Sequence, residues 1–101
     1  MASRLSLQTK LETLLGSRNV YYQPPESIKM KYPAIVYSRD NIDKKSADNI
    51  NYSLFNRYSV IVIDQLPDNA VVEKLLALPM CRYERSYKAD NLNHDVLTIY
   101  Y

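Results

Sequence analysis

The only thiol and the only imidazole of the chain belong to Cys81 and His94. A nucleophilic pair would need the two side chains in contact, with a carboxylate such as Asp90 or Asp95 orienting the imidazole. A free cysteine is more often an inert buried residue, and a histidine in a polar turn needs no catalytic role. A zinc site would need carboxylates to complete its four ligands. We therefore expect neither cysteine-dependent catalysis nor a metal site.

Two pairs of carboxylates are spaced so that they could serve acid–base chemistry, Asp40 with Asp43 and Asp64 with Asp68. Such chemistry needs one carboxyl group whose pKa is raised by burial. The first pair lies in a polar stretch beside lysines, and Asp68 occupies the position of a helix N-cap. The single glycine, Gly16, excludes loops that cradle phosphates with several glycines. We expect no enzyme activity and no cofactor.

Arginine and tyrosine alternate with other polar residues over residues 82–88. On a regular strand, Tyr83, Arg85 and Tyr87 would share one face, and the opposite face would carry the other four residues, Arg82, Glu84, Ser86 and Lys88. Aromatic rings beside cations can bind single-stranded nucleic acid, using Arg82, Tyr83, Arg85 and Tyr87. The same residue types are frequent at the centres of protein–protein interfaces, and that interpretation also accounts for the ten tyrosines.

The length of 101 residues and the hydrophobic fraction of 47% fit one folded domain covering residues 1–101. The net charge of +2 is too small for a dedicated nucleic-acid binder. One cysteine allows no internal disulfide, which suits a reducing compartment such as the cytoplasm. The sequence shows neither a signal peptide nor an apolar run that could cross a membrane, so we expect no membrane partner.

A helix is expected over residues 5–15, with Ser3 or Ser6 as its N-cap and Gly16 at its end. Its apolar residues recur every three or four positions, at Leu7, Leu11, Leu14 and Leu15. A short strand over 19–23 should follow and should stop at the two prolines 24 and 25. A further strand is expected over 34–38.

Residues 40–51 are polar and predict a long exposed loop or an extended hairpin tip. Residues 54–64 form the strongest strand pattern, with Tyr58, Val60 and Val62 on one face and Ile61 and Ile63 on the other. Asp68 should cap a second helix, which Pro79 ends; its apolar residues are Val71, Val72, Leu75, Leu76 and Leu78.

Two final strands, over 81–88 and 95–101, are close enough to form a hairpin. The Ala-Asp-Asn triplets at 47–49 and 89–91 suit Asx turns, because Asp and Asn tolerate left-handed backbone where glycine is absent. The order of elements predicts an α+β fold: a single mixed or antiparallel sheet of about five strands, with two helices packed on one face.

Six segments of the sequence occur in a characteristic order and at characteristic intervals: 20–26, 31–37, 46–49, 58–64 with Pro67-Asp68, 78–83 and 89–95. Together they resemble a family of small proteins from long-tailed bacteriophages, known as tail terminator, tail completion or minor capsid proteins. The resemblance covers nearly the whole chain from Val20 onward. None of these segments carries a reaction mechanism.

This resemblance implies a structural component of the virion neck, assembled in the cytoplasm of the bacterial host. Terminators of this kind have an α+β fold and form a hexameric ring on the last ring of tail-tube subunits. The implied partners are further copies of the chain, the tail tube protein and a head-side connector or stopper. Genomic DNA would pass through the lumen without specific binding. A head-closure or adaptor role in the same neck is an alternative.

A ring subunit needs two different surfaces toward its neighbours, because a head-to-tail contact must close on itself. We expect these surfaces on exposed parts of the strand 54–64, on the strand 82–88 and on the segment 40–51. Segments 24–31 and 40–51 are candidates for contact with the tail tube or the connector. The residues expected at subunit and partner interfaces are Asp43, Lys44, Lys45, Asp48, Asn49, Tyr58, Arg82, Arg85 and Tyr87.

Overall fold

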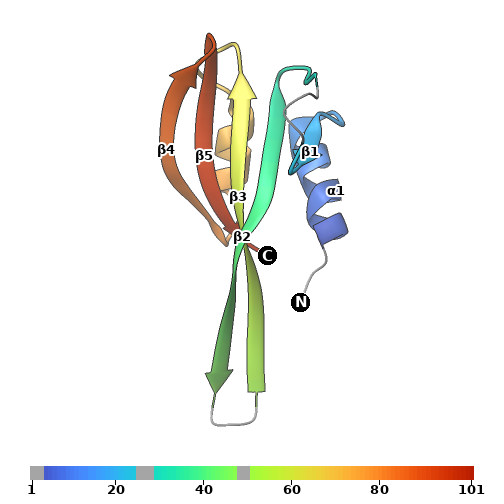
Figure 1. The fold of residues 1–101 in the computed structure, drawn as a ribbon, viewed down its shortest axis with the longest axis vertical. Helices are drawn as coiled ribbons and strands as arrows, with labels where there is room; N and C mark the ends of the chain where they lie inside the picture. The colour runs from blue at the N-terminus through green and yellow to red at the C-terminus, as the bar shows by residue number, and fades with distance from the viewer. Residues whose placement is uncertain (1–3, 25–28, 48–50) are drawn as a thin grey trace.

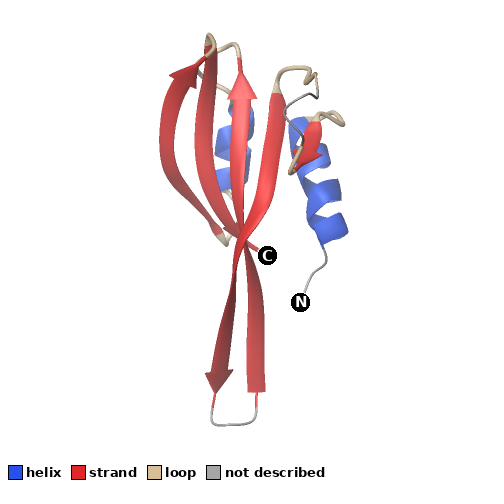
Figure 2. Ribbon diagram, viewed as in Figure 1, coloured by secondary structure: helices blue, strands red, loops and turns tan. Residues whose placement is uncertain are grey.

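One five-stranded mixed sheet with both helices against one of its faces makes up the fold (Figure 1, Figure 2). The computed structural model describes the backbone of residues 4–24, 29–47 and 51–101, with the side chains of these residues except 41–47 and 51–55. The elements are α1 (Arg4–Leu15), β1 (Val20–Tyr22), β2 (Ala34–Ala47), β3 (Asn51–Asp64), α2 (Ala70–Leu76), β4 (Cys81–Ala89) and β5 (Leu92–Tyr100).

The strands lie in the order β1-β2-β3-β5-β4. β1 pairs in parallel with β2, and the other three pairings are antiparallel. The expected α+β class, with one sheet and two helices on one face, is therefore confirmed. We call the face that the helices cover the inner face and the opposite one the outer face.

The core lies between the inner face and the helices. Alternate residues of the three central strands point inward, and α1 and α2 each contribute a buried apolar edge. The principal core residues are Leu7, Leu11, Ile35, Tyr37, Tyr58, Val60, Val62, Val71, Leu75, Leu97 and Ile99. The inward direction of Tyr58, Val60 and Val62 agrees with the alternation expected from the sequence.

Three tyrosines on neighbouring strands form a row beneath α1. The ring centroids of Tyr22 and Tyr37 are 4.9 Å apart, and those of Tyr37 and Tyr58 are 6.0 Å apart. The guanidinium group of Arg4 lies 4.4 Å from the centroid of the Tyr22 ring. The Tyr37 hydroxyl donates to Gln8 Oε1, and burial raises the pKa of Tyr37. Part of the tyrosine excess is thus used in the core, not on an interaction surface.

α1 ends where the sequence predicts. Gly16 has φ of 80°, and its N–H donates to the carbonyl of Glu12 at 2.9 Å, so the left-handed residue closes the last turn. Of the two expected N-caps, Ser3 lies outside the described residues. Ser6 lies within the first turn of the helix and is not its cap.

The N-cap of α2 is Asn69 and not Asp68, which corrects the expectation by one residue. Asn69 Oδ1 accepts from the N–H of Val71 at 2.8 Å, and Asn69 Nδ2 donates to Asp64 Oδ2 at 2.5 Å. An amide can accept at the helix start and donate to a carboxylate, whereas an aspartate at this position would only accept. The helix stops at Leu76, ahead of Pro79.

β2 and β3 are longer than expected and pair over their whole length as a hairpin, so the hairpin alternative for segment 40–51 is the correct one. β3 pairs with β5 only from Arg57 onward. The pairs from Ile42–Asn56 to Ala47–Asn51 therefore extend beyond the rest of the sheet as a two-stranded ribbon, which we call the arm (Figure 1).

The hairpin of β4 and β5 is confirmed, with a two-residue turn at Asp90 and Asn91. Their φ values are 52° and 62°, the left-handed pair that two-residue hairpins require. β5 starts at Leu92 and not at Asp95, because the polar residues after the turn pair directly with the end of β4.

Candidate assembly surfaces

Cys81 and His94 are held apart by the sheet. Cys81 on β4 pairs with Ile99 on β5, and His94 lies on β5 five residues before Ile99. About 17 Å of strand therefore separates Cys81 from His94. An odd separation also places them on opposite faces of the sheet. Burial raises the pKa of the Cys81 thiol, and the His94 ring stacks on Tyr87 with centroids 4.6 Å apart. This arrangement does not form a nucleophilic pair.

The carboxylates considered above as acid–base pairs have structural roles where their side chains are described. Asp40 Oδ1 accepts from Arg57 Nε at 2.8 Å, an ion pair at the root of the arm. Asp64 accepts from Asn69 and from the N–H of Leu66, which fixes the start of α2. Asp68 lines a groove that is described below.

A β-bulge in β4 changes the faces expected for its side chains. Tyr83 pairs with Leu97, but the next pair joins Arg85 to Val96, so the alternation shifts at Glu84. Tyr83 therefore lies on the inner face, where its hydroxyl donates to Asp95 Oδ1 at 2.9 Å. Arg85 and Tyr87 lie on the outer face. The expectation that Tyr83 shares a face with Arg85 and Tyr87 was wrong.

The outer face has no helix over it and carries side chains of mixed charge. Arg57 is paired with Asp40, and Arg82 Nε lies 4.0 Å from Glu84 Oε1, which also accepts from the Thr98 hydroxyl at 3.1 Å. A polar hollow of about 400 Å³ lies among these groups. The hydrogen bond that Arg57 donates to Asp40 raises the pKa of Arg57 above its usual value.

Arg82, Arg85 and Tyr87 are exposed on this outer face, as a contact surface requires. The guanidinium of Arg85 lies 5.9 Å from the centroid of the Tyr87 ring, and Tyr87 stacks in turn on His94. Arg85, Tyr87 and His94 thus form a row that runs from β4 to β5. Two of the cations in the hollow are already matched by carboxylates, so the face suits a polar protein surface better than a phosphate backbone.

Tyr58 is the one expected interface residue that the structure places in the core, with an exposed fraction of 0%. Its alternation with Val60 and Val62 turns it inward, so its side chain is not available to a neighbour. The backbone of Asp43, Lys44 and Lys45 lies on β2 within the arm, and their side chains are outside the described part of the chain. Asp48 and Asn49 lie wholly outside the described residues.

The arm is the feature that most separates this chain from a simple compact domain. The radius of gyration is 14.6 Å, against about 13 Å for a compact chain of this length, and the longest dimension is 50 Å. A two-stranded ribbon with no third strand or helix against it is only marginally stable in water.

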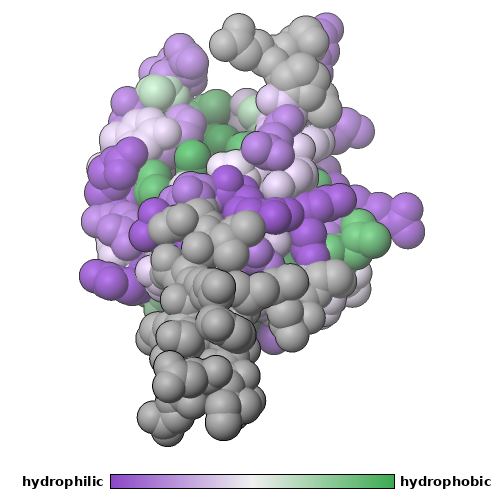
Figure 3. Space-filling view, turned by 60° about the horizontal axis from the view of Figure 1, so that its bottom comes forward, coloured by the Kyte–Doolittle hydropathy of each residue, from purple (hydrophilic) through white to green (hydrophobic). Residues whose placement is uncertain are grey.

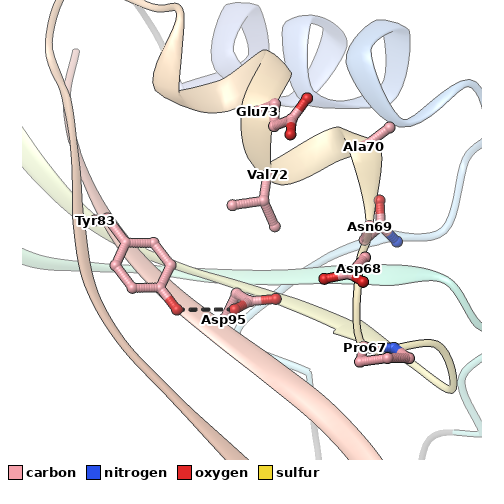
Figure 4. Close-up of a pocket in the computed structure, with 8 residues that line it drawn as sticks. All are labelled: Pro67, Asp68, Asn69, Ala70, Val72, Glu73, Tyr83 and Asp95. Atoms are coloured by element: carbon pink, nitrogen blue, oxygen red, sulfur yellow. Dashed lines mark hydrogen bonds between the residues drawn. The ribbon is translucent and has the colours of Figure 1, made fainter.

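A groove on the inner side of the molecule was not foreseen. It has a volume of about 380 Å³ and lies between α2 and the β4–β5 hairpin (Figure 4). We call it the α2 groove; its lining residues are Pro67, Asp68, Asn69, Ala70, Val72, Glu73, Tyr83 and Asp95. The sequence does not predict this groove, because its two walls come from segments that are far apart in the chain.

The end of the molecule from which the arm projects is mainly hydrophilic, with hydrophobic residues in separate spots (Figure 3). Over all faces of the molecule, the large apolar side chains that are exposed among the described residues include Leu5, Leu66, Leu76 and Met80. None of the described helices is long and apolar enough to span a membrane. In the described part of the chain, no three His, Cys, Asp or Glu side chains converge as metal ligands.

Neither a scan against protein-family models nor a comparison with curated proteins gave a match to this chain.

Proposed function

We propose that this protein is a structural component of the neck of a long-tailed bacteriophage, and specifically its tail terminator. Copies of the chain form a hexameric ring on the last ring of tail-tube subunits and present a surface to the head-side connector. The protein acts through these contacts in the virion, after assembly in the bacterial cytoplasm. It transforms no molecule and needs no cofactor, and the genome passes through the lumen without specific binding.

The observation that carries this proposal is the arm. In the part of the chain that the structure describes, no third strand pairs with this ribbon, so the ribbon gains stability when another molecule covers it. A projecting hairpin can reach across a subunit boundary, which is how one element could join neighbouring copies or the ring to the tube. The sequence segments that resemble phage terminators include 46–49, next to the end of this arm.

The outer face supports the same proposal. It is open, of mixed charge and rich in Arg and Tyr, which are the residue types that contribute most to protein–protein binding. Arm and outer face are two different surfaces, as a head-to-tail ring requires.

A role as a binder of single-stranded nucleic acid is less well supported. That hypothesis needs Tyr83, Arg85 and Tyr87 on one surface, but the bulge in β4 leaves Tyr83 on the inner face and the other two on the outer face. The remaining cations Arg57 and Arg82 lie beside carboxylates. A head-closure or adaptor role would use the same surfaces, and the position of the protein in the virion distinguishes it from a terminator.

The arm provides the test of this function. Replacing residues 43–55 with Asn-Gly closes the hairpin at the Ile42–Asn56 pair with a two-residue turn. We expect the shortened chain to keep its fold, because the core cluster lies outside the deleted segment. In a phage complementation assay it should give at least about tenfold fewer joined particles, since losing a central contact costs a few kcal/mol.

Circular dichroism and thermal unfolding of the shortened chain are the control for folding. A folded, shortened chain that yields wild-type numbers of infectious particles would contradict the role of the arm.

A further inference from the structure

We propose that adjacent copies in the ring join through opposite charges, with the α2 groove of one copy receiving the basic flank of the next. The basic flank consists of Arg18, Lys29, Lys31 and Tyr32, beside strand β1. This inference rests on the proposed ring and names one of its interfaces.

No cation among the described side chains forms an ion pair with a carboxylate of the α2 groove. Asp68, Glu73 and Asp95 line the groove, and the ion pairs found among the described residues are Arg57–Asp40 and Arg82–Glu84. Asp95 accepts from the Tyr83 hydroxyl, which is neutral. Lys74 follows Glu73 on α2 but does not line the groove. The groove therefore carries three negative charges that a positively charged partner would neutralise.

The walls between these carboxylates are partly apolar. Val72 and Pro67 line the groove from the side of α2, and the half-exposed ring of Tyr83 lies across from them (Figure 4). Lysine and arginine combine a long apolar stem with a charged end. Such a side chain can lay its stem on Val72 and on the Tyr83 ring while its charged end reaches a carboxylate.

The basic flank offers cations of this kind. Arg18, Lys29 and Lys31 are exposed, and none of them forms an ion pair with the described residues. Over residues 16–33 the sequence contains these three cations and one acidic residue, Glu26. Tyr32, with an exposed fraction of 37%, adds an apolar surface beside the charges.

The two surfaces lie at opposite edges of the sheet and at the same end of it. β1 is one edge strand and β4 is the other. Ala34 pairs with Ile63, so the basic segment before β2 and the groove segment after β3 leave the sheet at the same end. A contact from one edge to the opposite edge of the next copy is head-to-tail and can close into a ring.

Charge exchange provides the test. The groove variant carries Asp68→Lys with Glu73→Lys, and the flank variant carries Lys29→Glu with Lys31→Glu. Each variant alone places like charges opposite each other, and we expect its self-association to be roughly 100-fold weaker than that of the wild type. Native mass spectrometry and sedimentation measure the assembled fraction, in solution and on tail tubes.

Two further samples restore the opposite charges. A chain with all four substitutions should assemble, because each reversed groove meets a reversed flank. An equimolar mixture of the two variants should also assemble, because alternating copies place opposite charges at every contact of a six-membered ring. The control is Lys10→Glu with Arg39→Glu, which changes the net charge as the flank variant does, at exposed positions outside every surface assigned to a contact. It should assemble as the wild type does.

Wild-type assembly by both variants would contradict the inference, as would a loss that neither mixing nor combination restores. A wild-type chain that forms no ring, either free or on tail tubes, would instead contradict the proposed function itself.

Discussion

Tyr37 and Tyr58 are neighbours in the core, but their hydroxyl groups are in different situations. The Tyr37 hydroxyl donates to Gln8 and accepts from Arg4 Nη1 at 3.3 Å. The Tyr58 hydroxyl is buried and has no hydrogen-bond partner among the described residues. An unsatisfied buried hydroxyl lowers stability, whereas a satisfied one contributes to it.

The two matched substitutions to phenylalanine should therefore have different effects. We expect Tyr37→Phe to lower the free energy of unfolding by about 1–2 kcal/mol, because it leaves Gln8 without its donor. Tyr58→Phe should leave this free energy unchanged or raise it by up to about 1 kcal/mol, since it removes only an unpaired group. Denaturant unfolding of both variants checks the difference; equal losses would contradict it.

The start of α2 depends on one amide side chain. Asn69→Ala removes both the hydrogen bond to the N–H of Val71 and the one to Asp64. We expect a loss of about 1 kcal/mol in the free energy of unfolding, the usual value for an N-cap. Asp68→Ala is the matched control and should change it by less than about 0.5 kcal/mol, because Asp68 is exposed and caps nothing. A larger loss at Asp68 would show that the cap is misassigned.

At the scale of the elements, the periodicity of apolar residues predicts half-buried helices and strands, but it does not detect a strand that is polar along its whole length. The helix near Leu7 and Leu11 and the strand around Val60 were predictable, because each has an apolar face against the core. For residues 40–51 the sequence predicts a hairpin only as an alternative to an exposed loop. Its residues between Asp40 and Asn51 have low strand propensity, and only pairing with the partner strand reveals the hairpin.

The candidate site was predictable to a similar extent. Three of the residues expected at an exposed surface lie on one: Arg82, Arg85 and Tyr87. Tyr58 was expected at such a surface too but lies in the core, because strand alternation does not say which face of the sheet is covered. The bulge at Glu84 has no sequence signal, and it separates Tyr83, which lines the α2 groove, from Arg85 and Tyr87 on the outer face. A groove between distant segments can be found only from the folded chain.

The bulge also affects the free edge of the sheet. β4 is an edge strand whose residues after Cys81 are exposed, and such edges can pair with other chains and aggregate. A bulge and the charges of Arg82, Glu84, Arg85 and Lys88 discourage this pairing. Contacts at this edge should therefore use side chains and not further strand pairing, in agreement with the charged contact proposed for the α2 groove.

At the scale of the whole molecule, the chain combines a small closed core with four surfaces that its own described residues leave open. The arm extends beyond the sheet, the outer face has no helix over it, and the α2 groove and the basic flank lie at opposite edges. Each surface differs from the others in shape and charge. A subunit that meets two neighbours, a tube and a connector needs several such surfaces.

The most direct measurement is electron microscopy of tails assembled with and without this protein. With the protein present, we expect one ring of six copies at a single end of each tube, tubes of uniform length and tails that join heads. Without it, the tubes should vary in length and remain free of heads. Tubes of uniform length that join heads without the protein, or a position of the protein elsewhere in the virion, would contradict the terminator role.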